Sequence, residues 1–146
     1  MNIITLGVFD VLHVGHVRLL KFCKSLGHLT VGLNTDEFTM RYKHSPPTMN
    51  YKERKCMLKE LGFIDRILPN DEPDWTIKPL LKDIDLIVVG SDWAVKDYVG
   101  QIGVDWKWLE KHSIGICYYP RSLDISTTKI KERIINDNSS NSILGK

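Results

Sequence analysis

Two histidines, His13 and His16, stand three residues apart where the pattern of the chain changes. An apolar run ends shortly before them, and an amphipathic helical pattern begins at Val14. Because residues i and i+3 share one face of a helix, both imidazoles can point at one ligand. The first turn of a helix also offers unpaired N–H groups and the positive end of the helix dipole. The pair is therefore a candidate anion-binding site.

The same spacing also fits a metal pair or a structural role, and by itself it does not choose among the three. A zinc site would need a third ligand and a glutamate beside the first histidine. Instead, Leu12 and Val14 flank His13, and the three cysteines lie far apart. The strand expected before the pair and the helix expected after it favour phosphate, and Gly7 and Gly15 leave room for its approach. We expect no metal ligands in the protein itself.

A second polar segment follows the last expected strand. Three consecutive hydroxyl residues, Ser126, Thr127 and Thr128, stand at the expected start of a helix. Arg121 precedes them and Lys129 follows. Helix capping explains one of the three hydroxyls. Together with the first motif, the remaining hydroxyls and cations favour a second phosphate site that holds the outer phosphates of a nucleotide.

Short apolar runs alternate with helical patterns along the chain. The runs predict strands over residues 3–8, 29–33, 66–68, 86–89 and 114–119, and the helical patterns predict helices over 14–25, 52–61, 77–82, 105–111 and 126–135. Continuous apolar strands separated by helices indicate an α/β fold, a five-stranded parallel sheet with helices on both faces. Ligands of such sheets bind beyond the carboxyl ends of the strands. Both polar segments fall at that edge.

Bulk properties limit the class of protein. The 146 residues fit one domain over 1–135, followed by a polar segment, 136–146, that we expect to be a flexible tail. The net charge of +2 is too small to favour nucleic-acid binding, and no apolar run is long enough to cross a membrane. Three cysteines in apolar patterns indicate buried thiols and a cytoplasmic protein. Residues 39–50 hold a proline pair and basic residues without periodicity, which predicts a mobile loop over the site.

The motifs together resemble the cytidylyltransferase branch of the HxGH nucleotidyltransferase superfamily, and most of all the glycerol-3-phosphate cytidylyltransferases. The resemblance covers about residues 2–135. It rests on GVFD at 7–10, HVGH at 13–16, NTDEF at 34–38, YKER at 51–54, GSDW at 90–93 and ISTT at 125–128. The combination of HxGH and ISTT carries most of it.

The resemblance implies a Rossmann-like nucleotidyltransferase fold and transfer of CMP from CTP to a phosphorylated alcohol, with glycerol 3-phosphate favoured and pyrophosphate released. It implies Mg²⁺ carried by the triphosphate, a homodimer, and no nucleic-acid or membrane partner. Catalytic roles are implied for His13, His16 and Lys43. Nucleotide contacts are implied for Gly7, Val8, Phe9, Asp10, Gly15, Asp92, Trp93, Arg121, Ile125, Ser126 and Thr127. Acceptor contacts are implied for Arg54 and Trp75.

Some alternatives stay open at this point. The basic residue of 39–50 that contacts phosphate could be Arg41, Lys43 or His44. Arg54 fits a surface salt bridge as well as an acceptor contact. Trp75 fits core packing as well as an acceptor contact. Two other functions also fit: an adenylyltransferase acting on a sugar phosphate, and a nucleotide-binding module without turnover. The identity of the nucleotide consumed separates the first from a cytidylyltransferase, and pyrophosphate release separates the second.

Overall fold

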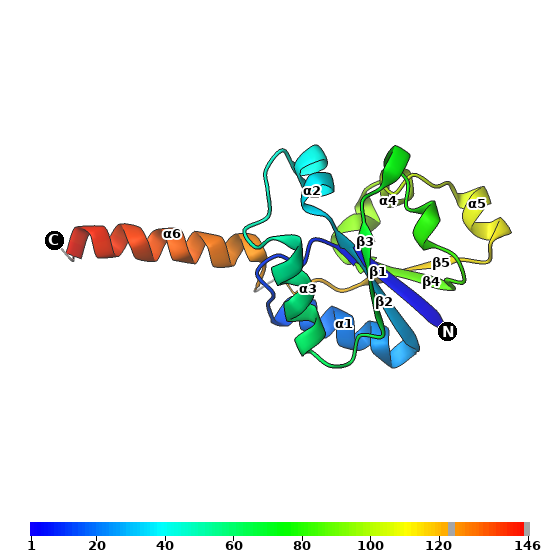
Figure 1. Ribbon diagram of the computed structural model, residues 1–146, viewed down its shortest axis with the longest axis horizontal. Coiled ribbons are helices and arrows are strands. Elements are labelled where there is room, and N and C mark those ends of the chain that lie inside the picture. The colour runs from blue at the N-terminus through cyan, green and yellow to red at the C-terminus, as the bar shows by residue number, and fades with distance from the viewer. Residues whose placement is uncertain (123–124, 145–146) are drawn as a thin grey trace.

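A five-stranded parallel sheet forms the centre of the molecule (Figure 1). The computed structural model describes residues 1–122 and 125–144, without the side chains of residues 139–144. The strands are β1 (Asn2–Gly7), β2 (His28–Asn34), β3 (Arg66–Asn70), β4 (Leu86–Gly90) and β5 (Gly115–Tyr119), in the order β3-β2-β1-β4-β5. All neighbouring pairs are parallel. The predicted fold class and all five predicted strands are confirmed.

Helices cover both faces of the sheet, as the sequence predicts (Figure 1). On one face, α1 (Val14–Leu26) and α3 (Tyr51–Glu60) bury Leu20 and Leu58 in a cluster that includes Ile3 of β1. On the other, α4 (Tyr98–Gln101) and α5 (Trp106–Lys111) bury Val99 and Leu109 in a cluster that includes Ile4. Ile3 and Ile4 serve opposite faces because successive side chains of a strand alternate.

The segment after β2 differs from the prediction. Residues 39–43 belong to a helix, α2 (Asp36–Lys43), and are not part of a loop. The side chain of Thr35 caps this helix by accepting the backbone N–H of Phe38, and His44 ends it with a φ of 59°. Only Phe38 and Thr39 are buried, so the helix leaves little apolar periodicity for sequence reasoning to detect.

Short 3₁₀ turns occupy the crossover between β3 and β4. The helix predicted over 77–82 is a single turn, η2 (Lys78–Leu80), flanked by η1 (Pro73–Trp75). Pro79 lacks the N–H that a longer helix would need at this position. A third turn, η3 (Ser91–Val95), follows β4 directly and was not predicted.

The last helix, α6 (Thr127–Leu144), projects from the body of the molecule (Figure 1). The sequence predicts its end near residue 135, and the structure corrects this because helical backbone continues to Leu144. Residues 136–144 therefore extend α6, and residues 145–146 lie outside the described part of the chain. Their flexibility stays a prediction. No helix in the described part of the chain has the length and apolar character needed to cross a membrane.

Candidate active site

The site lies where the order of the strands reverses. From β1 the chain builds outward through β2 and β3, then crosses back to place β4 on the other side of β1. Such a switch point opens a crevice beyond the carboxyl ends of the strands. Two adjoining cavities of about 280 Å³ and 430 Å³ lie there. They share His16, Asp92, Thr127 and Thr128, so the segments predicted to meet at this edge do meet.

Local hydrogen bonds orient both histidines. The Nδ1 atom of His13 accepts the backbone N–H of Gly15 at 3.0 Å, and that of His16 accepts the backbone N–H of His13 at 3.2 Å. The two rings stack with their centroids 3.7 Å apart. A Cβ atom on Gly15 would lie 2.9 Å from the ring of His13, so only glycine fits between the histidines.

These contacts set the proton positions of the imidazoles. A ring nitrogen that accepts an N–H carries no proton, so a neutral His13 or His16 carries its proton on Nε2. Burial, together with the positive charge of His13, lowers the pKa of His16 to about 3. Burial, together with Arg121, also lowers the pKa of His13. The crevice is therefore lined by two neutral imidazoles, each with an Nε2–H to donate.

The 280 Å³ cavity lies between the histidine turn and the start of α6. Its lining includes His13, Gly15, Asp92, Arg121, Ile125, Ser126 and Thr127, all of them predicted nucleotide or catalytic residues. Ser126 also caps α6, because its hydroxyl accepts the backbone N–H of Lys129. The hydroxyl of Thr127 donates to the backbone carbonyl of Asp10 and fastens α6 to the turn after β1.

The 430 Å³ cavity is the more cationic of the two. Lys43 at the end of α2 and Lys131 in α6 both line it, together with the predicted residues Gly7, Val8, Phe9 and Asp10. Burial and the nearby Lys131 lower the pKa of Lys43, while Asp10 opposes that shift. Two ammonium groups that approach one cavity from different helices suit a polyphosphate.

Asp10 organises the walls of this cavity. Its carboxylate accepts the backbone N–H groups of Thr48 and Met49 at 2.7 and 2.9 Å, and Lys131 lies 3.2 Å away. Burial alone would raise its pKa, but these hydrogen bonds and the charge of Lys131 hold the pKa below its usual value. Asp10 therefore tethers the loop before α3 and orients Lys131.

Lys43 is the only one of the three candidate cations of residues 39–50 that lines a described cavity. The guanidinium of Arg41 packs over the rings of Phe38 and Trp75 and donates to the backbone carbonyl of Asp71. His44 occupies the left-handed position that ends α2. Of the three, Lys43 is therefore the candidate for the phosphate contact.

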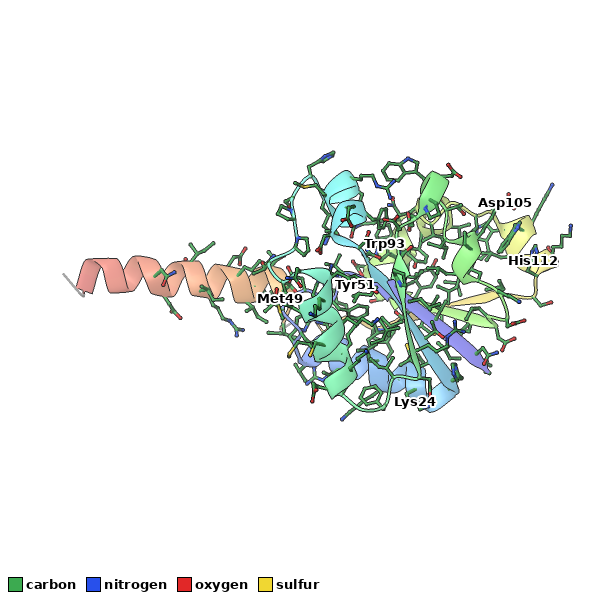
Figure 2. The ribbon with its side chains drawn as sticks, viewed as in Figure 1. Lys24, Met49, Tyr51, Trp93, Asp105 and His112 are labelled. Carbon is green, nitrogen blue, oxygen red and sulfur yellow. The ribbon has the colours of Figure 1, made fainter. Side chains whose placement is uncertain are left out.

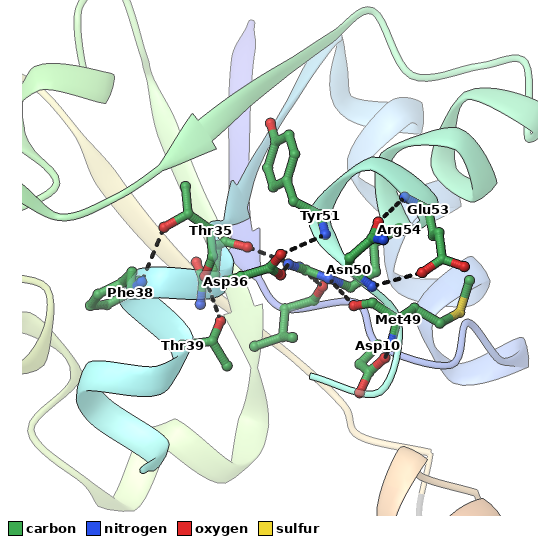
Figure 3. Close-up of polar contacts among 12 residues, drawn as sticks. Asp10, Thr35, Asp36, Phe38, Thr39, Met49, Asn50, Tyr51, Glu53 and Arg54 are labelled. Carbon is green, nitrogen blue, oxygen red and sulfur yellow. Dashed lines mark hydrogen bonds and ion pairs between the residues drawn. The ribbon is translucent and has the colours of Figure 1, made fainter. Parts of the chain in front are cut away.

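Arg54, for which an acceptor contact was predicted, lies in a buried hydrogen-bond network, and that contact stays a prediction. Its side chain is fully buried and donates to the carbonyls of Met49, Val8 and Asn34 (Figure 3). Its guanidinium also pairs with the carboxylate of Asp36 at 2.7 Å. Arg54 lines none of the three cavities, but it bonds to Val8 and Asn34, which do, and it joins the ends of β1 and β2 to α3. The salt bridge considered from the sequence does form, between a fully buried Arg54 and an Asp36 side chain that is 39% exposed.

The two tryptophans have different surroundings. Trp93, labelled in Figure 2, lines the 430 Å³ cavity, as the nucleotide assignment requires, and also a third, smaller one. Trp75 is 53% exposed and lines none of the three cavities. It stacks on Arg41 and meets the edge of Phe38. The core packing considered for Trp75 is therefore wrong, and its acceptor contact stays a prediction.

Several lining residues escape sequence reasoning. Lys131 lies one helical turn after Thr127, and this spacing was a usable signal because residues i and i+4 share a helix face. Asn70 and Glu72 line the third cavity from the β3 end, where no recognisable motif precedes or follows them. The motifs reveal the nucleotide side of the site better than its far side.

The donor set bears on Mg²⁺. Among the described residues, no group of three or more His, Cys, Asp or Glu side chains could hold a metal ion. The carboxylate of Asp92 lines both large cavities and lies 3.8 Å from the guanidinium of Arg121, while that of Asp10 already has three partners. One carboxylate beside bound phosphates matches the usual environment of Mg²⁺. The residues therefore fit a magnesium ion that arrives with a triphosphate.

Known proteins resemble this chain over most of its length. A family model described as Cytidylyltransferase-like matches residues 4–133. Glycerol-3-phosphate cytidylyltransferase of Bacillus subtilis (strain 168) is 37% identical over 91% of this chain and 96% of that protein. The enzyme of the same name from Staphylococcus aureus (strain NCTC 8325 / PS 47) is 35% identical over 91% of this chain and 94% of its own.

The fold also has a solved counterpart. The crystal structure of the lipopolysaccharide core biosynthesis protein from Thermoplasma volcanium GSS1 superposes with a TM-score of 0.63 at 27% sequence identity. The match covers 84% of this chain and 96% of that protein. Sequence, fold and family model agree, and the chain belongs to the cytidylyltransferase-like family.

Proposed function

We propose that this chain transfers CMP from CTP to glycerol 3-phosphate and releases pyrophosphate. The observation that carries the proposal is the convergence of two Nε2–H donors, Lys43 and Lys131 on adjoining cavities at the switch point. Relatives named glycerol-3-phosphate cytidylyltransferase, aligned over nearly the whole chain, support the choice of nucleotide and acceptor.

In the proposed reaction, a phosphate oxygen of the acceptor bonds to the α-phosphorus of CTP. The bond from that phosphorus to the α–β bridging oxygen breaks, and pyrophosphate leaves with the electron pair. Such displacements depend mainly on positioning and charge stabilisation. His13 and His16 donate to the α-phosphate and the bridging oxygen, and Lys43 holds the α-phosphate as charge develops.

The start of α6 supplies the contacts for the outer phosphates, where Ser126, Thr127 and Arg121 lie at or beside the 280 Å³ cavity. Phe9 packs its ring edge-on to His16, with ring centroids 5.3 Å apart, and limits the freedom of that ring. Asp92, together with the phosphates, would hold a Mg²⁺ ion, which would supply charge neutralisation for the leaving pyrophosphate.

Assembly and location belong to the same proposal. Cys23, Cys56 and Cys117 are all free, which agrees with a reducing compartment such as the cytoplasm. The prediction of buried thiols is right for Cys23 and wrong for Cys56, which is exposed. Ile134 and Ile135 on the projecting part of α6 are 54% and 63% exposed, and they offer apolar surface to a second copy of the chain. Light scattering after size exclusion tests the proposed homodimer directly.

One assay tests the chemistry. Pyrophosphate release is measured with CTP, ATP, GTP and UTP, each against glycerol 3-phosphate, phosphoethanolamine and a heptose phosphate. We expect CTP with glycerol 3-phosphate to give the highest kcat/KM. Turnover with ATP and the heptose phosphate instead would establish the adenylyltransferase alternative, and nucleotide binding without pyrophosphate release would establish a binding module.

A further inference from the structure

A third cavity, of about 120 Å³, continues the crevice beyond the phosphate cavity on the β2–β3 side. It shares Gly7, Tyr42 and Trp93 with the 430 Å³ cavity, so the two adjoin. Its volume is well below the roughly 300–1,000 Å³ of pockets that hold drug-sized ligands. It therefore suits the small head of an alcohol and not a nucleoside.

Buried polar side chains form one wall of this cavity. Asn34 ends β2 and Asn70 ends β3, and the register of the two strands pairs them directly. The Nδ2 group of Asn70 donates to Oδ1 of Asn34 at 2.8 Å. Two oxygens are left, Oδ1 of Asn70 and Oε2 of Glu72, that are buried and have no hydrogen-bond partner in the described part of the chain.

Those unpartnered oxygens call for a donor. Asn70 is 2% exposed and Glu72 is 4% exposed, and buried polar groups are stable only when hydrogen-bonded. Oδ1 of Asn70 can only accept, and Oε2 of Glu72 accepts in the ionised carboxyl, so the missing partner of these two atoms donates hydrogen. A hydroxyl group of a ligand in the cavity meets that requirement.

The charge of the cavity excludes a phosphate and disfavours a cation. Among the described residues that line it, none is Lys, Arg or His. Burial raises the pKa of Glu72 to about 7, although Asn70 and Arg41 act in the opposite direction, so a large share of this carboxyl is neutral at neutral pH. Acceptor oxygens beside the aromatic rings of Trp93 and Phe38 suit the hydroxyls and C–H groups of a polyol.

We propose that Asn70 and Glu72 accept hydrogen bonds from the hydroxyl groups of the acceptor, so that this cavity selects polyol phosphates. The inference rests on the proposed cytidylyltransferase function, and it divides the acceptor between two cavities. Its phosphate faces the lysines of the 430 Å³ cavity, and its hydroxyls enter the 120 Å³ cavity next to it.

The wild-type enzyme provides the first test. With saturating CTP, kcat/KM is compared for glycerol 3-phosphate, which has two hydroxyls, and n-propyl phosphate, which has none. We expect the loss of the hydroxyls to lower kcat/KM roughly tenfold or more, since a site built to bind a hydroxyl leaves polar groups unpaired without it. Equal values for the two acceptors, or a preference for phosphocholine, overturn the proposal.

A substitution localises the effect. Glu72→Leu keeps the approximate size of the side chain and removes both acceptor oxygens, and Glu37→Leu makes the same change on the exposed side of α2. We expect Glu72→Leu to lower kcat/KM roughly tenfold for glycerol 3-phosphate and to leave n-propyl phosphate unchanged. Glu37→Leu should change neither. Equal losses on both acceptors would mean that Glu72 is only structural, and this would overturn its role in selectivity.

The two proposals fail in different ways. Absence of pyrophosphate release by the wild-type enzyme with CTP and every acceptor contradicts the proposed function. Ready turnover of CTP that is indifferent to acceptor hydroxyls contradicts the polyol site alone. Should Glu72→Leu not fold, the wild-type comparison of acceptors still decides the question.

Discussion

The two ends of the crevice are built in opposite ways. At the nucleotide end, His13 and His16 are held by backbone N–H groups within three residues of their own positions. At the acceptor end, Asn34, Asn70 and Trp93 come from the ends of three different strands or the turns after them. A contiguous motif fixes the first end, and the register of the sheet assembles the second.

This difference has a physical cause. The orientation of the histidines depends on the first turn of one helix, so a short sequence contains all the information that it needs. The Asn34–Asn70 pair exists only because β2 and β3 align these residues across the sheet. Local geometry survives in a motif, whereas a distributed site depends on the whole fold.

Arg54 bonds to residues at both ends of the crevice, and its substitution should cause the largest loss of stability. It holds the carbonyl of Val8 after β1 and that of Asn34 at the end of β2, and it pairs with Asp36. Arg54→Ala leaves these buried acceptors unpaired, and we expect the free energy of unfolding to fall by about 3–5 kcal/mol. Urea unfolding followed by tryptophan fluorescence measures it.

The matched control for Arg54 is Arg66→Ala, an exposed arginine at the start of β3, which should change stability by less than about 0.5 kcal/mol. A stable Arg54→Ala protein with a raised KM for glycerol 3-phosphate would contradict the structural role. It would return Arg54 to the acceptor site that the sequence suggested.

The histidine pair allows the two roles of each ring to be separated. Asparagine places an acceptor near the position of Nδ1 and has no counterpart of the Nε2–H, so His13→Asn and His16→Asn keep the helix start and lose the donor. We expect kcat to fall about 100- to 1,000-fold in each, equivalent to about 2.7–4 kcal/mol. Steady-state kinetics with CTP measures the loss, and His28→Asn, on the exposed start of β2, is the control. Near-normal turnover in both variants would remove the catalytic role.

Lys43 tests the division between the two ends of the crevice. It lines the 430 Å³ cavity and follows Tyr42, which lines both that cavity and the 120 Å³ cavity. Lys43→Gln removes one charged hydrogen bond to phosphate, and we expect kcat to fall by a factor equivalent to about 1.5–3 kcal/mol. Arg41→Gln and His44→Asn, which alter its neighbours outside the cavities, should leave kcat nearly unchanged. A larger loss in either neighbour would transfer the role to that residue.

The same contrast explains how much could be foreseen. Short apolar runs that alternate with helical patterns predict all five strands. The HVGH and ISTT segments predict the nucleotide side of the site. Capping by Thr35, which starts α2 without clear periodicity, was not recognised, and residues 39–43 of α2 were mistaken for part of a loop. The burial and hydrogen bonds of Arg54 could not be predicted either, because its three carbonyl partners come from separate segments that meet only in the folded chain.

The smallest expected effect is the pH dependence of stability, which should have opposite signs for His16 and Glu72. The folded protein holds the pKa of His16 at about 3, below the 6.5 of an unfolded chain. Below pH 6.5 the unfolded state therefore binds a proton that the native state does not, and this contribution to stability is lost as the pH falls. Glu72 acts in the opposite sense, since its pKa of about 7 exceeds the unfolded value of 4.5, and its contribution is lost as the pH rises from 4.5 to 7.

Two variants measure these opposed dependences of stability on pH separately. Relative to wild type, His16→Asn should gain stability as the pH falls from 6.5 to 5, and Glu72→Gln should gain stability as the pH rises over the same interval. Each change should be on the order of 1–2 kcal/mol, since one pH unit across a shifted pKa corresponds to about 1.4 kcal/mol. Urea unfolding at pH 5 and 6.5 measures both. Slopes of the same sign in the two variants would contradict at least one of the two pKa shifts, because burial lowers the pKa of an imidazole and raises that of a carboxyl.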